Sequence, residues 1–268
     1  LQQYIVGLFK SGGDGGKRLQ NALNGTWLGH PLHPMITDVP VGAWTCTAVL
    51  DAAGALSGNE SLNSAADLTL VTGLAAGTGA ALTGFTDWSD TFGKERSVGL
   101  LHGLMMVLTY TTYTVSLLAR LGGARKTGVG LANLGYGFLA AGAYIGGDVV
   151  YDIGFGVNHS AFIHGPSDFT TVMSESDLEP GTLAQGDAGG TGVMLARQSG
   201  EIYALGDTCV HAGCSLSTGT LADRSVICPC HGSQFDLATG AVINGPATMP
   251  APHYDVRVQD GMIQVKRA

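Results

Sequence analysis

The sequence predicts an α + β protein in two parts, a bundle of four transmembrane helices followed by a small antiparallel all-β domain. Three observations lead to this fold class. Charged residues make up 13% of the 268 residues, against roughly 25% in soluble domains. Four apolar segments each approach the ~20 residues that cross a bilayer. After about Asn158, short alternating strands separated by turn residues replace the long apolar runs.

The apolar segments run through residues 35–56, 65–86, 98–119 and 128–149. They are rich in small residues spaced four apart, such as Gly73/Gly77 and Gly142/Gly146, a spacing that lets helices approach closely in lipid. We therefore assign residues 35–150 to a four-helix transmembrane domain and residues 1–34 to an N-terminal segment at the membrane interface. With four spans, residues 1–34, the loop 87–97 and the β domain are expected on one face of the membrane.

Two hairpin signals mark the second part of the chain. Residues 193–197 and 201–205 flank Gln-Ser-Gly, and residues 254–258 and 262–266 flank Gln-Asp-Gly. We therefore assign residues 170–268 to a small antiparallel β domain and the Gly-containing residues 151–169 to a linker. The β domain carries 5 basic and 10 acidic residues. This charge argues against a nucleic acid as partner and suits a protein with a basic docking face.

Two cysteine–histidine strings in the β domain form a candidate ligand set. They are Cys209-Val-His211 and Cys228-Pro-Cys230-His231. Two thiolates and two imidazoles can hold a tetrahedral zinc ion, or an iron–sulfur cluster with thiolates on one iron and imidazoles on the other. Glycines at 213 and 232 would let two tight loops point backbone N–H groups at sulfur.

The extended strings, Cys209-Val-His-Ala-Gly-Cys214 and Cys228-Pro-Cys-His-Gly-Ser233, closely resemble a Rieske [2Fe–2S] site. The resemblance implies that Cys209 and Cys228 ligate the buried iron and that His211 and His231 ligate the outer iron. It also implies a disulfide between Cys214 and Cys230, as in high-potential Rieske domains, and a hydrogen bond from Ser233 to a bridging sulfur. Rieske oxygenases match poorly, because their Rieske sites lack the second cysteine pair.

Two positions depart from the high-potential pattern. Phe235 stands where such members carry a tyrosine, so one hydrogen-bond donor is missing and an intermediate potential is expected. Ala212 stands where the family usually has leucine, which is expected to leave His211 more exposed. Residues 244–247, Asn-Gly-Pro-Ala, resemble the third, proline-containing loop that covers the cluster.

The membrane half carries a second resemblance. Gly29-His30-Pro-Leu-His33-Pro, Gly84-Phe-Thr-Asp87-Trp88 and Val98-Gly-Leu-Leu-His102-Gly resemble an uncharacterised family of four-helix bacterial membrane proteins, some of which carry a C-terminal Rieske domain. This family brings no established chemistry, so the membrane half has to be interpreted from its residues.

Histidines within or beside spans are the candidate site of this half, because an ionisable group in a membrane is costly. The first and third spans run in the same direction, so His33 or His30 would face His102 at equal depth. The residues leave three interpretations open: axial ligation of a haem b, a quinone pocket, or a structural role with His102 bonded to Asp87 or to a backbone carbonyl.

The sequence thus predicts a membrane-anchored Rieske electron-transfer subunit, a component of an oxidoreductase complex rather than a stand-alone enzyme. It would pass single electrons between a membrane carrier, quinol or haem b, and a redox partner protein or a subunit of a respiratory or photosynthetic complex. The alternatives are a passive four-helix anchor with a redox-active head, and a self-contained quinol-oxidising unit. The expected location is the lipid bilayer of a bacterial cell membrane. The disulfide favours an extracytoplasmic head.

Overall fold

The computed structural model describes all residues 1–268, which form two compact units. The membrane unit comprises Leu1–Gly7 and Leu32–Ile153, and the β unit comprises Leu8–Pro31 and Gly154–Ala268. Each unit has a hydrophobic core of its own. The predicted fold class, helices followed by an antiparallel β domain, is confirmed.

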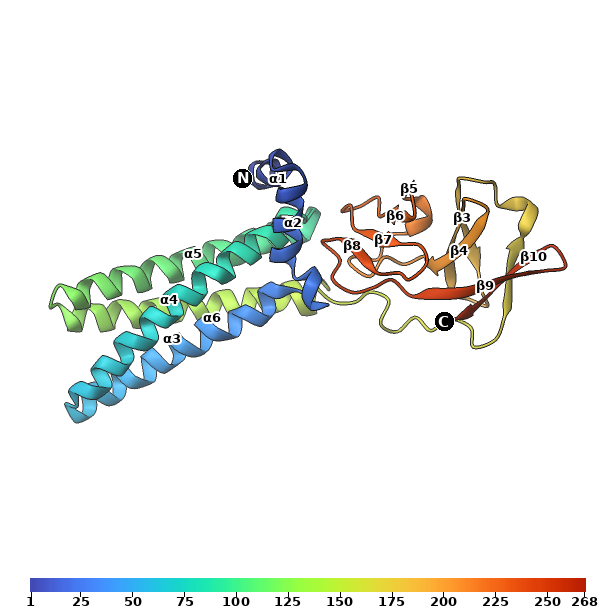
Figure 1. The fold of residues 1–268 in the computed structure, drawn as a ribbon. Helices are drawn as coiled ribbons and strands as arrows, with labels where there is room; N and C mark the ends of the chain where they lie inside the picture. The colour runs from blue at the N-terminus through green and yellow to red at the C-terminus, as the bar shows by residue number, and fades with distance from the viewer. The chain divides into compact units, whose positions relative to one another are not determined.

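Four long helices build the membrane unit: α3 (Leu32–Ser57), α4 (Glu60–Ser89), α5 (Gly93–Leu121) and α6 (Arg125–Tyr151). All four are long and apolar enough to cross a membrane, and each begins before and ends after its predicted span. The helices pack as two antiparallel pairs, which we call the first hairpin (α3 and α4) and the second hairpin (α5 and α6) (Figure 1).

The two hairpins repeat one pattern of buried residues. Each buried residue of α5 lies a fixed number of residues after a buried residue of α3. Each buried residue of α6 likewise lies a fixed number of residues after a buried residue of α4. In α3 and α5 the repeated positions are Pro40, Trp44, Thr47 and Asp51, then Thr109, Tyr113, Ser116 and Arg120. In α4 and α6 they are Ala66, Leu70, Gly73, Gly77 and Ala80, then Gly128, Ala132, Gly135, Leu139 and Gly142.

Equivalent residues of the two hairpins meet each other in the core. Trp44 stacks on Tyr113 with ring centroids 4.5 Å apart and planes only 4° from parallel. A glycine lies against each ring. A Cβ added at Gly73 would lie 2.3 Å from Trp44, and one added at Gly135 would lie 3.1 Å from Tyr113. Contacts between equivalent positions are what an approximate two-fold axis produces, so the membrane unit is an internal duplication.

A buried ion cluster ties the hairpins together about two helical turns beyond the aromatic stack. The Arg120 guanidinium donates to Asp51, at 2.9 Å from Nη1 to Oδ1, and to Asp67 at 2.7 Å. Arg125 completes the set with a 2.9 Å pair to Asp67. The side chains of Asp51 and Arg120 are each 2% exposed. Sequence reasoning did not find this cluster, because its members come from all four long helices.

Two short helices precede the membrane unit's long ones. In α1 (Gln2–Ser11), Gln2 Nε2 donates to the carbonyl of Trp88 at 2.7 Å. The next helix, α2 (Gly13–Asn24), belongs to the β unit. The location of residues 1–34 at the membrane interface stays a prediction.

The β unit contains two antiparallel sheets. The six-stranded sheet has the order β1-β10-β9-β4-β3-β2 and the four-stranded sheet the order β5-β6-β7-β8. Both predicted hairpins are confirmed: Gln198 pairs with Glu201 where β3 meets β4, and Gln259 pairs with Met262 where β9 meets β10. The strands are β1 (Thr170–Ser174), β2 (Leu183–Asp187), β3 (Gly192–Gln198), β4 (Glu201–Gly206), β5 (Thr220–Ala222), β6 (Ser225–Ile227), β7 (Gln234–Asp236), β8 (Val242–Asn244), β9 (His253–Gln259) and β10 (Met262–Arg267).

Candidate metal centre

Two six-residue loops of the same design carry the cysteine–histidine strings. We call residues 209–214 the first cysteine loop and residues 228–233 the second. In each, the N–H of the first residue donates to the carbonyl of the sixth at 2.8 Å, and the N–H of the fifth donates to the carbonyl of the first at 2.9 and 3.1 Å. The fifth residues are Gly213 and Gly232, with φ of 77° and 75°. That left-handed conformation explains why both are glycine.

The thiols of Cys209 and Cys228 lie together beneath the loops, with the residues 1% and 2% exposed. They are hydrogen-bonded to each other. This bond, with burial, raises the pKa of Cys209, and it lowers the pKa of Cys228 to about 6. Each sulfur also accepts two backbone N–H groups, as the sequence predicts for loops built around sulfur. The donors are His211 and Ala212 on the first loop and Cys230 and His231 on the second.

The two loop histidines form the other half of the site. The ring centroids of His211 and His231 lie 4.8 Å apart, with planes 79° apart. The Nδ1 atoms of both are buried, and His211 Nδ1 has no hydrogen-bond partner in the protein. Burial, and then the neighbouring His231 and His159, lower the pKa of His211 to about 3. A neutral imidazole with an unsatisfied buried nitrogen is the form that ligates a metal.

The four side chains form two pairs. Nowhere in the chain do three or more His, Cys, Asp or Glu side chains converge where a single metal ion could bind. A thiol pair and an imidazole pair match a cluster of two irons, whereas a structural zinc requires one tetrahedral set. The residues present therefore fit a [2Fe–2S] cluster.

A disulfide joins the two cysteine loops, as the resemblance implies. Cys214 and Cys230 are bonded, with Cα atoms 6.5 Å apart. The predicted disulfide is thus confirmed. Because each loop contributes one cysteine to the bridge and one thiol to the buried pair, the bridge holds the loops at a fixed spacing around the site.

The third loop is held from two sides. Ser233 is fully buried, and its Oγ accepts the N–H of Ala247 at 2.9 Å, which leaves the hydroxyl proton for another acceptor. From α2, the Asn21 amide donates to Asn244 at 2.9 Å and accepts the N–H of Gly245 at 3.0 Å. Sequence reasoning missed this role of α2, because no local pattern links a helix near the N-terminus to a loop near the C-terminus.

The segment after the membrane helices covers His211. The Phe155 ring meets the His211 ring edge to face, with centroids 5.8 Å apart. Two hydrogen bonds anchor the segment to the first cysteine loop and its approach: the N–H of His159 to Val210 O at 3.0 Å, and Ser160 Oγ to Thr208 O at 2.8 Å. His211 is consequently only 9% exposed. The expectation that Ala212 leaves it bare is wrong, because Phe155 takes the covering position.

In the membrane unit the structure brings together His33 and His102. Their ring centroids lie 6.3 Å apart, with planes 80° apart. Each Nδ1 lies 2.9 Å from a backbone carbonyl, that of Ala80 for His33 and that of Gly142 for His102. Of the bonds considered for His102, the structure contains the one to a backbone carbonyl. His30 is exposed, with its Nδ1 3.3 Å from Pro31 O.

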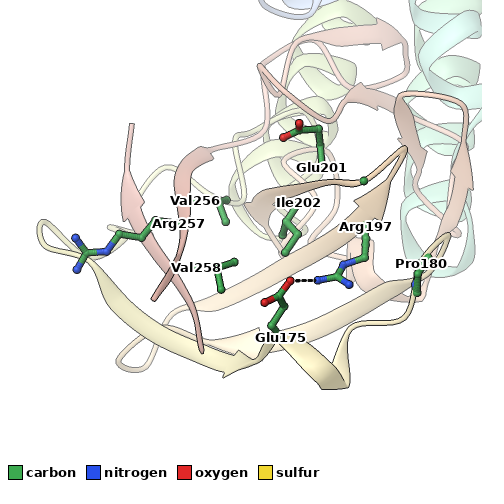
Figure 2. A pocket seen from close by; sticks show the side chains of 9 residues that line it. Glu175, Pro180, Arg197, Glu201, Ile202, Val256, Arg257 and Val258 are labelled. Carbon is green, nitrogen blue, oxygen red and sulfur yellow. Dashed lines mark hydrogen bonds and ion pairs between the residues drawn. The ribbon is translucent and has the colours of Figure 1, made fainter. Parts of the chain in front are cut away.

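A surface hollow of about 360 Å³ lies on the six-stranded sheet. Figure 2 shows Arg197 pointing to Glu175 across it, an ion pair of 2.7 Å. None of the lining residues belongs to the cysteine loops. This hollow is therefore separate from the candidate metal centre.

Both parts of the chain match known families. Residues 168–257 match the Rieske [2Fe-2S] domain, and residues 29–159 match the family described as predicted membrane protein (DUF2231). Ferredoxin CarAc of Metapseudomonas resinovorans is 36% identical over 95 residues, which are 35% of this chain and 89% of that protein. The cytochrome b6-f complex iron-sulfur subunit of Chlorobaculum tepidum is 34% identical over 76 residues, which are 28% of this chain and 41% of that protein.

Among solved structures, the ferredoxin of carbazole 1,9a-dioxygenase from Nocardioides aromaticivorans IC177 is 32% identical, covers 38% of this chain and 100% of its own, and has a TM-score of 0.36. The two curated relatives named above match about a third of this chain or less, and they are electron-transfer components. The chain therefore belongs to the Rieske [2Fe–2S] family through residues 168–257, joined in one polypeptide to a predicted membrane protein (DUF2231) domain at residues 29–159.

Proposed function

We propose that this protein is a membrane-anchored electron-transfer subunit whose cluster is ligated by Cys209 and Cys228 on one iron and by His211 and His231 on the other. The observation that carries the proposal is the pairing in the two cysteine loops, a buried thiol pair and an imidazole pair. When bound, the cluster supplies a one-electron couple at roughly −150 to +300 mV.

The chain's own residues set the conditions for that couple. Backbone N–H groups point at both cysteine sulfurs, and the disulfide fixes the spacing of the loops. Hydrogen bonds to sulfur stabilise the more negative, reduced state. The loops thus bind and orient the cluster with little rearrangement between its two redox states.

Anchored in the membrane through the helical unit, this head exchanges electrons with a membrane carrier, quinol or haem b. The other partner is a redox protein or a subunit of a respiratory or photosynthetic complex, and the head's excess of acidic residues suits a basic docking face. We place the protein in a bacterial cell membrane with the head on the extracytoplasmic side, because a structural disulfide persists in an oxidising compartment.

The test is an electron paramagnetic resonance spectrum of the purified, dithionite-reduced full chain. A rhombic Rieske signal, with two irons per chain by analysis, is the expected result. An iron-free protein containing one zinc per chain would overturn the proposal. If the Rieske signal is present but neither a quinol nor a haem in the membrane reduces the cluster, the four helices serve as an anchor only.

We predict that the reduction potential of the cluster rises with the number of hydrogen-bond donors around it. Ser233→Ala removes a hydrogen bond worth about 1–2 kcal/mol, and it should lower the potential by roughly 40–90 mV for a one-electron couple. Phe235→Tyr restores a donor and should raise it. Redox titration, monitored through the Rieske signal, measures the potentials of both variants. Ser225→Ala is the control, a buried serine whose hydroxyl donates to Ala222 O at 2.6 Å. A Ser233→Ala potential equal to that of the control would refute the role of this hydroxyl.

We also predict that Phe155→Ala uncovers His211 and speeds electron exchange with small soluble oxidants several-fold, because the imidazole edge then reaches solvent. Stopped-flow oxidation of the reduced cluster by an uncharged cobalt complex measures this rate. Phe162→Ala is the matched control, a phenylalanine in the same segment that is already 92% exposed. Equal rates in the two variants would show that Phe155 does not limit access.

A further inference from the structure

We propose that His33 and His102 are the two axial ligands of one haem b, held between the first and second hairpins of the membrane unit. Both ligands and every contact that supports them belong to the membrane unit. The physiological role of the haem, passing electrons to the cluster, rests on the proposed function.

The hydrogen bonds of the two histidines fix which ring nitrogen is available. A backbone carbonyl only accepts hydrogen bonds, so the 2.9 Å contacts to Ala80 O and Gly142 O require a proton on Nδ1 of His33 and of His102. Neutral imidazole then carries a free lone pair on Nε2. A ring N–H bonded to a backbone carbonyl is the usual support of a metal-ligating histidine, because it sets both the tautomer and the ring orientation.

The separation of the rings suits a shared metal ion. Metal–nitrogen bonds of about 2 Å, and the ~1 Å from a ring nitrogen to its centroid, place two imidazoles on opposite sides of one ion with centroids roughly 6 Å apart. The observed distance is 6.3 Å. A direct ring-to-ring hydrogen bond of about 2.9 Å would bring the centroids to roughly 5 Å. The distance is longer than a direct hydrogen bond requires and is compatible with a metal ion between the rings.

The ligand count points to haem rather than to a bare ion. No third His, Cys, Asp or Glu joins the pair, whereas zinc sites take three or four protein ligands. Two imidazoles can complete the coordination only of a metal ion whose other ligands belong to a cofactor. Haem iron brings four pyrrole nitrogens and leaves two axial positions for histidine.

The internal duplication places the two ligands equivalently. His102 follows His33 at the same offset in the sequence that relates Tyr113 to Trp44. Glycine borders each ring, because an added Cβ would lie 2.7 Å from His33 at Gly84 and 3.0 Å from His102 at Gly146. Each hairpin thus presents one imidazole in the same setting, from opposite sides of the approximate two-fold axis.

The same hydrogen bonds disfavour a quinone at this position. Quinone oxygens accept hydrogen bonds, but both Nδ1 protons of the pair are already donated to carbonyls. The Nε2 atoms that remain are acceptors. The histidine pair consequently offers a metal two lone pairs and offers the oxidised form of a quinone no donor.

The experiment uses the full chain purified from membranes of a host that makes haem b. Reduced-minus-oxidised spectra should show a haem b α-band, and the pyridine haemochrome should give one haem per chain. His33→Ala and His102→Ala should each lose more than nine-tenths of the haem. His30→Ala, altered in the same His-Pro-Leu-His-Pro string but at an exposed side chain, should keep it.

Two further measurements separate ligation from a structural role. His102→Gly should regain low-spin haem spectra when imidazole is added, because free imidazole enters the vacated position. His102→Met should keep a low-spin haem at a raised potential, since thioether ligation favours the reduced iron. A purely structural histidine would give neither result.

The Rieske signal of the same samples keeps the two proposals distinguishable. A chain with the Rieske signal but no haem overturns the haem site and leaves the electron-transfer function standing. A chain with haem but no Rieske signal supports the haem site and overturns the function. Loss of haem in His30→Ala as complete as in His33→Ala would overturn the assignment of His33.

Discussion

Cys228→Ala is expected to abolish the [2Fe–2S] cluster and with it all electron transfer by the head. Cys228 lies beneath the second cysteine loop with its sulfur in contact with Cys209. Alanine leaves one iron with a single protein thiolate, and protein iron–sulfur clusters require the full ligand set. Iron per chain should fall from about two to near zero, measured by metal analysis together with the rhombic resonance signal.

Two other cysteines provide matched controls for this substitution. Cys46→Ala changes an exposed, unpaired cysteine of α3 and should leave the signal unchanged. Cys230→Ala breaks the disulfide two positions from Cys228. The bridge closes a sequence separation of 16 residues, so its loss should destabilise the head by about 3 kcal/mol and make the cluster labile without preventing assembly. A persistent rhombic signal in Cys228→Ala would disprove the ligand assignment.

Arg120→Ala is expected to destabilise the membrane unit by about 3–5 kcal/mol. The substitution removes the closer of the two arginines that pair with Asp51, whose side chain is 2% exposed, and leaves it only the 3.3 Å pair with Arg125. It also opens the 2.7 Å pair with Asp67. A buried carboxylate that loses its closest cation is costly, because a side chain so little exposed is poorly compensated by solvent. Unfolding in mixed detergent micelles, followed by tryptophan fluorescence, measures the change.

A double variant shows whether the loss comes from the unpaired charge. Asp51→Leu with Arg120→Leu removes both charges and leaves the 2.9 Å Arg125–Asp67 pair in place. Replacing a buried ion pair by apolar side chains is often neutral, so the double variant should be more stable than Arg120→Ala. If it is less stable than the single variant, packing rather than charge explains the effect.

The elements that could be predicted from the sequence depend on local patterns. The four spans follow from hydrophobic length, and the hairpin of β9 and β10 follows from turn residues between alternating strands. The cysteine loops were predictable because their glycines, cysteines and histidines lie close together in the chain, from Cys209 to Ser233. The disulfide was predictable only through the resemblance to Rieske domains, since the pairing itself joins two loops.

The contacts that were missed connect distant segments. Asn21 holds the third loop, and Phe155 covers His211, but neither residue stands in a pattern that marks it. The ion cluster was missed for a different reason. Arg120 stands just past an apolar segment, where a loop charge is expected, and Asp51 lies within another that contains no basic residue to pair with it. The signal that would have found the cluster is the constant offset between α3 and α5, which relates the histidines, the aromatic rings and the charged pair.

The charged pair breaks the duplication in one respect, and this has a consequence for assembly. Histidine repeats as histidine and tryptophan as tyrosine, but Asp51 is matched by Arg120. If a first hairpin paired with the first hairpin of another chain, two carboxylates would meet in the core, and two second hairpins would bring two guanidinium groups together. Like charges in a low-dielectric interior repel strongly. The charges thus favour pairing between unlike hairpins and disfavour like-with-like exchange between chains.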